Sequence, residues 1–231
     1  MTDIFQRTEK LIGTERLNIL KNATVAVVGL GGVGSYTVEA LGRAGVGHLI
    51  LVDPDQVEVT NINRQLPALT SSIGKYKADV LANRLLDINP NIKVTKHNLS
   101  LNAANQAKLL DGQIDYVVDA IDSVPDKVGL IKYCFDQQMP IISAMGAANR
   151  IDPTLFKIAD IKNTSVCPLA KKVRKELRNL GIYEGVEVLY SMEKPINIDM
   201  NKDNILGTIS FVTGIAGLLL ASVVIRSLVN F

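Results

Sequence analysis

The stretch Thr24-Val25-Ala26-Val27-Val28-Gly29-Leu30-Gly31-Gly32-Val33-Gly34 decides the fold expected for this chain. Its first five residues are an almost uniformly apolar, β-branched run, which is typical of a strand buried on both faces of a sheet. The glycine pattern GxGxxG follows at once, and the residues after it have the periodicity of a helix. This order predicts the first βα unit of an α/β, Rossmann-like, doubly wound fold.

The same alternation continues as far as Ser143, which predicts a mostly parallel sheet with helices on both faces. The expected strands are residues 24–28, 48–52, 92–97, 116–118 and 140–143. The expected helices are residues 35–44, 76–88, 103–110 and 126–138. Beyond Asn149 the rhythm changes, so we expect a single domain with a nucleotide-binding core at 1–149 and a C-terminal α+β elaboration at 150–231. The elaboration is expected to contain helix 169–180, strand 186–190 and an apolar segment at 205–225.

The composition is that of an ordinary globular protein, with a net charge of +2 and 47% apolar residues. Attraction of the whole protein to nucleic acid is excluded at this charge, so any such binding needs a local basic patch. The two cysteines, Cys134 and Cys167, form no CxxC pair, and the first residues have no apolar segment of a secretory signal. We therefore expect a cytoplasmic protein without a zinc site or a disulfide framework.

The glycine loop is expected to hold a phosphate, because a backbone without side chains can approach the ligand and donate its N–H groups. Asp53 closes the next strand 19 residues after Gly34, where its carboxylate can accept hydrogen bonds from ribose hydroxyls. Dinucleotide oxidoreductases share this pattern, so an NAD-dependent enzyme is one interpretation of the loop and Asp53 alone.

The residues after Asp53 favour ATP. Val59-Thr60-Asn61-Ile62-Asn63-Arg64-Gln65 and Gly74-Lys75-Tyr76-Lys77-Ala78 place cations near the same edge of the sheet. A site that cleaves ATP between its α- and β-phosphates needs cations for the departing pyrophosphate. Asp122, in Asp119-Ala120-Ile121-Asp122-Ser123, adds a carboxylate at the same edge and is a candidate ligand for Mg²⁺. The alternative for each residue is a solvated surface charge or a helix cap.

Together, GLGGVG, the DxDxVxxxNxNRQ stretch from Asp53 to Gln65, GKYKA and DAIDS resemble the E1-like superfamily of thiamine, molybdopterin and ubiquitin activating enzymes. This resemblance implies that Arg64 and Lys77 bind the phosphates of ATP and that Asp122 serves Mg²⁺ and catalysis. The other nucleotide-binding residues that it implies are Gly29, Gly31, Gly32, Gly34, Asp53, Asp55, Asn61 and Gln65. Arg7 is similar to an N-terminal arginine that reaches into the partner subunit's site in some relatives, which implies a homodimer.

Within the superfamily, Ile151-Asp152-Pro153-Thr154 and residues 168–178 resemble the tRNA threonylcarbamoyladenosine dehydratase family. That family uses ATP to activate the threonine carboxylate of the modified adenosine at tRNA position 37, and the side chain then closes into a ring. The closing nucleophile is tethered in the same molecule, so no enzyme thiol is needed. Cys134 lies in Ile131-Lys132-Tyr133-Cys134-Phe135, which is typical of a buried helix face, whereas Cys167 lies at a loop and helix start where a thiol could react.

Two other functions remain open from the sequence. One is an adenylyltransferase that activates the C-terminus of a small β-grasp sulfur carrier, with a sulfur-transfer protein as a possible partner. The other is a scaffold that senses nucleotide and binds tRNA without turnover. A substitution of Asp122 separates the enzymes from the scaffold.

Two segments of the C-terminal part carry further predictions. Residues 171–178 contain five cations that suit a surface for tRNA phosphates, or else an ordinary solvated helix face: Lys171, Lys172, Arg174, Lys175 and Arg178. Residues 205–225 contain no charge and are long enough to span a bilayer. Their many glycines and hydroxyl side chains favour a helix buried in the core or in a dimer interface over membrane contact.

Overall fold

The computed structural model describes residues 4–196 and 206–231. Within these residues the strands form one seven-stranded sheet in the order β3-β2-β1-β4-β5-β7-β6. The strands are β1 (Thr24–Val28), β2 (His48–Val52), β3 (Lys93–His97), β4 (Tyr116–Asp119), β5 (Ile141–Ala144), β6 (Phe156–Asp160) and β7 (Glu187–Ser191). All neighbouring pairs are parallel except β6 and β7. The predicted doubly wound, mostly parallel sheet is confirmed.

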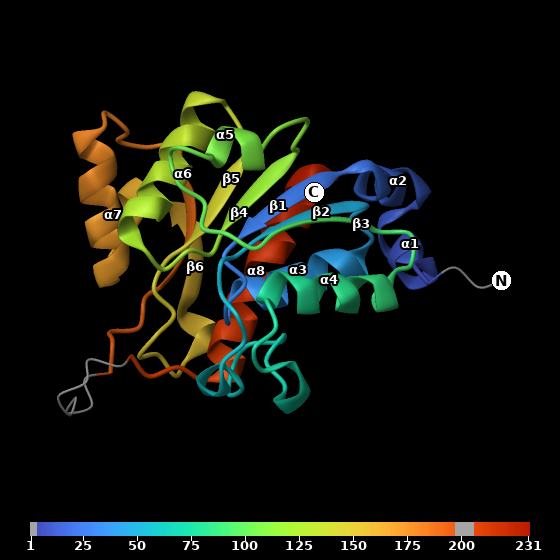
Figure 1. Cartoon of the computed structure of the whole chain (residues 1–231). Helices are drawn as coiled ribbons and strands as arrows, with labels where there is room; N and C mark the ends of the chain where they lie inside the picture. The colour runs from blue at the N-terminus through green and yellow to red at the C-terminus, as the bar shows by residue number, and fades with distance from the viewer. Residues whose placement is uncertain (1–3, 197–205) are drawn as a thin grey trace.

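Helices cover both faces of the sheet (Figure 1). The helices are α1 (Gln6–Ile12), α2 (Thr14–Asn22), α3 (Gly34–Ala44), α4 (Lys77–Ile88), α5 (Gln106–Leu109), α6 (Val124–Asp136), α7 (Pro168–Asn179) and α8 (Ser210–Leu228). Side chains such as Val27 and Leu51 pack against α3, α4 and α8, whereas the alternate residues Val28 and Val52 face α5 and α6. Because a strand turns successive side chains to opposite faces, apolar residues at every position give a sheet buried on both sides.

Some boundaries differ from the prediction. The helix expected at 103–110 is only α5, because Asn102 Oδ1 accepts from Ala104 N and Asn105 Oδ1 accepts from Asn102 N, and these bonds form a turn instead. Strand β6 and helices α1 and α2 were not predicted. Short 3-10 turns lie at Val59–Asn61, Thr70–Ser72, Pro153–Leu155 and Ile161–Asn163.

Helix α8 replaces the apolar segment predicted at 205–225, of which Ile205 lies outside the described residues. It is long and apolar enough to cross a membrane by length and composition. One side of it, which includes Val212, Leu220 and Val224, is buried in the core against α3 and the sheet. Thr37 Oγ1 of α3 also donates to the Gly217 carbonyl at 3.0 Å. The predicted buried packing is thus observed for this side, while Leu218 on the other is 49% exposed.

The order of the strands reverses between β1 and β4, because the chain moves to β2 and β3 on one side and to β5 and β7 on the other. The loops that follow β1 and β4 therefore run in opposite directions and leave a crevice between them. Doubly wound sheets bind their ligands in this crevice. The loops after β1, β2, β4 and β5 all meet at this edge.

Candidate nucleotide and substrate site

The glycine loop lies against the loop that follows β4. Gly29 has φ +89°, and a Cβ atom there would lie 2.5 Å from the carbonyl oxygen of Ala120. A Cβ atom at Gly34 would lie 1.8 Å from the carbonyl oxygen of Gly29. Glycine is therefore required at both positions, since a side chain at Gly29 would push away the loop after β4 and a side chain at Gly34 would open the glycine loop itself. The other two predicted glycines, Gly31 and Gly32, line the cavity described below.

Asp53 ties the end of β2 to the glycine loop. Its Oδ2 accepts from the backbone N–H of Leu30 at 2.6 Å, and its Oδ1 accepts from the N–H of Asp55 at 2.8 Å. Burial raises the pKa of Asp53 above the usual range of a carboxyl, while the Lys77 ammonium opposes that rise. Asp53 is thus a fixed acceptor in the crevice, in the position expected for a ribose contact.

Lys77 is the first residue of α4 and is only 5% exposed, so it is not the solvated surface charge considered as its alternative. Its Nζ lies 2.7 Å from Asp55 Oδ2 and 4.0 Å from Asp53 Oδ1. A buried ammonium needs such partners, because removal of a charge from water is unfavourable. The cation is therefore held in the crevice beside two of the predicted nucleotide-binding carboxylates.

The segment Asn61 to Gln65 forms a second side of the crevice. Arg64 Nη1 donates to the Thr60 carbonyl and to Asn63 Oδ1, both at 2.9 Å. Buried Asn61 caps its own turn through a bond from the Glu58 N–H to Asn61 Oδ1. Gln65 is also buried, and no group in the described part of the chain donates a hydrogen bond to its Oε1. Asn61, Arg64 and Gln65 all line the same cavity.

Asp122 is presented by the loop after β4, and its side chain is exposed. This loop is held from below, where Asp119 Oδ1 accepts from Ile121 N at 3.0 Å and Asp119 Oδ2 lies 2.7 Å from Lys127 Nζ. Lys127 and Asp119 are fully buried, and Ser143 Oγ donates to the same carboxylate. The buried ion pair therefore fixes the loop that places Asp122 at the cavity.

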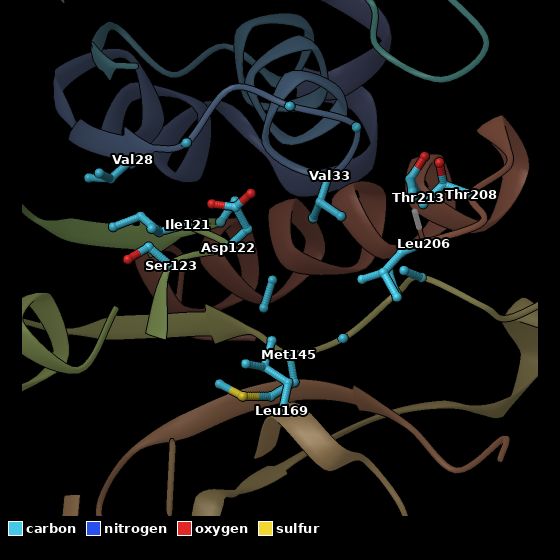
Figure 2. A pocket seen from close by; sticks show the side chains of 18 of the residues that line it. Val28, Val33, Ile121, Asp122, Ser123, Met145, Leu169, Leu206, Thr208 and Thr213 are labelled. Carbon is cyan, nitrogen blue, oxygen red and sulfur yellow. The ribbon is translucent and has the colours of Figure 1, made fainter. Parts of the chain in front are cut away.

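These residues surround one cavity of about 920 Å³ at the reversal of strand order, a volume at the upper end of typical ligand pockets. It is large enough to extend beyond the nucleotide loops to a second wall. Figure 2 shows Asp122 between the loop that carries Val33 and the opposite wall, which contains Met145 and Leu169. The structure thus places all the predicted nucleotide-binding residues around this cavity except Arg7 and the buried Gly34, which shapes the glycine loop without lining the cavity.

Arg7 lies on α1, is exposed, and does not line the cavity. The neighbouring Phe5 packs near Gly45, which precedes β2, so α1 lies toward the opposite end of the strands (Figure 1). The contribution of Arg7 to a partner subunit's site stays a prediction.

The five cations of α7 do not share one environment. Lys172 lines the cavity, and Lys171, Lys175 and Arg178 are exposed. Arg174 turns to the protein instead, where its Nη1 donates to the Thr164 carbonyl at 2.9 Å and to Thr164 Oγ1. Val173 and Leu177 are buried in the core, as expected from their spacing.

Several cavity residues were missed as site residues or left unassigned, among them Asp126 at the start of α6. Asn149 and Arg150 follow β5, and Cys167 is the N-cap of α7. For Asn149 and Arg150 the signal in the sequence was position alone, after a parallel strand. Cys167 lacks that signal, because it follows the antiparallel strand β6 and a 3-10 turn. Cys134 is fully buried, which raises the pKa of its thiol to about 12 with a further contribution from the charge of Asp119. Among the described residues no group of three or more His, Cys, Asp and Glu side chains could hold a metal ion.

Residues 5–231 match the family described as the ThiF family. A match over nearly the whole chain is strong evidence, and it agrees with the topology and with the glycine loop. The chain therefore belongs to the ThiF family, and its predicted E1-like character is confirmed.

Within that family the chain groups with the tRNA threonylcarbamoyladenosine dehydratases. It is 48% identical to the tRNA threonylcarbamoyladenosine dehydratase of Bacillus subtilis over 201 residues, which cover 86% of this chain and 79% of the relative. The crystal structure of the Escherichia coli tRNA N6-threonylcarbamoyladenosine dehydratase in complex with ATP has a TM-score of 0.91 and 35% identity, with 98% of this chain and 93% of the other covered. The complex of the same enzyme with AMP has a TM-score of 0.93 and 34% identity, with 99% and 96% covered. The family predicted from residues 151–154 and 168–178 is confirmed.

Proposed function

We propose that this protein uses ATP to adenylate the threonine carboxylate of N6-threonylcarbamoyladenosine at tRNA position 37, which leads to the cyclic, dehydrated form. The observation that carries the proposal is the shared cavity. Lys77 and Arg64 line it beside the glycine loop, and the cavity continues past Asp122 to a second wall with room for an acyl substrate. The similarity to relatives with this name and to an ATP complex supports the same function.

In the proposed reaction a carboxylate oxygen attacks the α-phosphorus, and pyrophosphate leaves. The acyl adenylate has AMP as its leaving group, so a nucleophilic atom of the tethered carbamoyl group can close the ring. Overall the substrate loses one water, whose oxygen departs on AMP. High effective molarity makes an enzyme nucleophile unnecessary, in agreement with the burial of Cys134 in the core.

Different residues of the cavity have different roles in this reaction. The loop Gly29 to Gly34 and Asp53 hold the nucleotide, while Lys77 and Arg64 stabilise charge on the phosphates. Mg²⁺ in nucleotide sites takes one or two carboxylates and completes its shell with phosphate oxygens and water. Asp122 and Asp126 line the cavity and fit that requirement, although the protein alone offers no metal cage in its described part. The bound ion would neutralise charge on the leaving pyrophosphate.

We also propose where the enzyme acts and which macromolecules it contacts. A tRNA substrate implies action in the cytoplasm, and the exposed cations of α7 would contact tRNA phosphates. A homodimer would allow Arg7 to complete the site of a second subunit. The proposed partners also include a sulfur-transfer protein.

The direct test is AMP release by the purified protein with tRNA that carries the threonylcarbamoyl group, compared with tRNA that lacks it. Cyclic nucleoside should appear in chromatograms of the digested product. Lys77→Met and Asp122→Asn should each lower turnover by about 10²–10³-fold, as is typical for loss of a preorganised charge partner. The control Lys75→Met changes an exposed lysine two residues away that does not line the cavity, and it should retain activity.

The outcomes separate the alternatives. Pyrophosphate exchange stimulated by a small β-grasp protein and not by tRNA would instead support an activator of sulfur carriers. Full biological activity of Asp122→Ala with intact ATP and tRNA binding would support a scaffold. Binding of NADH without ATP would support an oxidoreductase.

A further inference from the structure

Arg150 is a cation whose hydrogen-bonding capacity is largely unused. It lines the cavity, yet its side chain is 95% buried, since only 5% of the residue is exposed. Its Nη1 donates to the carbonyls of Ala148 at 3.0 Å and Asn149 at 3.3 Å. Its Nε is buried and has no hydrogen-bond partner among the described residues. A buried donor without an acceptor is unfavourable, and this one belongs to a charged group.

The guanidinium also lacks an ion-pair partner. Over residues 4–196 and 206–231, no carboxylate oxygen lies within 4.0 Å of its nitrogens. The carboxylate of Glu193 is near enough to influence its pKa, but accepts instead from the N–H groups of Ile151 and Asp152. Burial lowers the pKa of Arg150 from the ordinary value of arginine, which reflects the loss of water around the cation. An anionic ligand would compensate for that loss.

Arg150 belongs to the wall that the nucleotide loops do not use. It follows β5 in the chain, and the thiol of Cys167, another cavity residue, also influences its pKa. Met145 and Leu169 of the same wall face the region of Asp122 in Figure 2. Of the four cations that line the cavity among the described residues, Arg64 and Lys77 lie beside the nucleotide loops, and Lys172 is exposed on α7. Arg150 is thus the buried cation of the second wall.

We propose that Arg150 forms the subsite for the carboxylate of the acyl substrate and holds this group for attack on the nucleotide. This inference rests on the proposed function, because it assigns the acid of that reaction to a place in the cavity. The planar guanidinium can donate two parallel hydrogen bonds to a carboxylate, a geometry that lysine cannot reproduce. Two donors on Nε and Nη2 would bind the acid while Nη1 remains on the backbone carbonyls, so the side chain is already oriented. Neutralisation by a fixed cation also limits repulsion between the carboxylate and the phosphates.

The test compares acid and amide forms of one substrate. A tRNA assembled with a synthetic anticodon loop would carry the threonylcarbamoyl group either as the free acid or as its neutral carboxamide. Wild-type protein saturated with a non-hydrolysable ATP analogue should bind the acid at least about tenfold more tightly, as expected for hydrogen bonds to a charged group. In Arg150→Met that ratio should fall close to one, and Arg150→Lys should retain part of it.

Lys172→Met is the matched control, since it removes a cation of the cavity mouth. This substitution should weaken the binding of the acid tRNA and of the carboxamide tRNA equally, and so leave the ratio of the two affinities unchanged. If Arg150 has only a structural role, Arg150→Met should weaken the binding of both tRNAs equally, and the ratio of their affinities should not fall. That result would overturn the inference, and so would equal affinity of the wild type for the two tRNAs. If Arg150→Met does not fold, Arg150→Gln and Arg150→Lys provide the same comparison. Failure of the proposed function is distinct, because wild-type protein would then release no AMP with the acid-bearing tRNA.

Discussion

At the scale of single residues, Gly34 controls how closely the glycine loop folds on itself. An alanine Cβ there would meet the carbonyl oxygen of Gly29 at 1.8 Å, so Gly34→Ala should displace the loop and cost about 1–3 kcal/mol. ATP affinity should fall with it. Gly129→Ala is the control, because this glycine of α6 has no atom within 4 Å of the added Cβ and should gain up to about 1 kcal/mol. Urea denaturation and nucleotide titration measure both effects, and equal stabilities would contradict the expected strain.

The buried thiol of Cys134 should make the stability of the protein depend on pH. Burial, with the charge of Asp119, raises its folded-state pKa to about 12 from a reference value of 9.0. A raised pKa means that the folded state keeps its proton, so the contribution to stability is complete below pH 9.0 and is lost as the pH rises toward 12. Between these values wild-type stability should fall about 1.4 kcal/mol per pH unit more steeply than that of Cys134→Ala. Denaturation curves at pH 8.5 and about pH 10.5 test it; parallel losses in the two proteins would refute the assignment.

At the scale of elements, the cations of α7 lie in two environments on one helix. Arg174 fastens the helix to the loop after β6 through Thr164, whereas Lys171, Lys175 and Arg178 are exposed. Removal of the charges of Lys171, Lys175 and Arg178 should weaken tRNA binding and lower its salt dependence by about one unit of slope per lost phosphate contact. The unfolding midpoint should not change. Filter binding over a range of salt concentrations measures the slope, and an unchanged slope would mean that tRNA does not contact this face.

Arg174→Gln should give the opposite result. Loss of its bonds leaves the Thr164 carbonyl without a partner, so stability should fall by about 1–3 kcal/mol. The salt slope of tRNA binding should remain close to that of the wild type. A reduced slope without destabilisation would place Arg174 on the tRNA surface after all.

At the scale of the whole molecule, the C-terminal part completes the sheet that the N-terminal part begins. Strand β7 pairs with β5, and α8 packs on α3, where Gly217 lies so close that a Cβ atom would be 2.3 Å from the Val33 carbonyl oxygen. We therefore propose that 1–231 is one folding unit. Unfolding monitored by circular dichroism and by tyrosine fluorescence should give coincident transitions. A fragment of residues 1–149 should not fold cooperatively, because it would expose the β5 edge and the α3 face; a stable fragment would disprove a single unit.

Much of this arrangement could be predicted from local patterns. The strands near 24–28 and 48–52 were predicted to the residue, because they combine β-branched composition with flanking turns. Strand β6 was missed, since Phe156–Asp160 is a short antiparallel edge strand whose pairing with β7 depends on residues some thirty positions away. The place of Asp53, Lys77 and Asp122 in the cavity was predictable from motifs, but that of Arg150 was not. A lone arginine after a strand carries no local signal of its burial.

The sequence by itself determined the alternation of strands and helices, the glycine loop and the identity of the charges that follow each strand, because these depend on neighbours along the chain. Only the tertiary structure decided which charges are buried and which face water. Arg174 and Lys172 lie two positions apart on one helix, yet packing turns one to a buried loop and the other to the cavity. Desolvation is a property of the assembled fold, and it distinguishes the paired Lys77 from the unpaired Arg150.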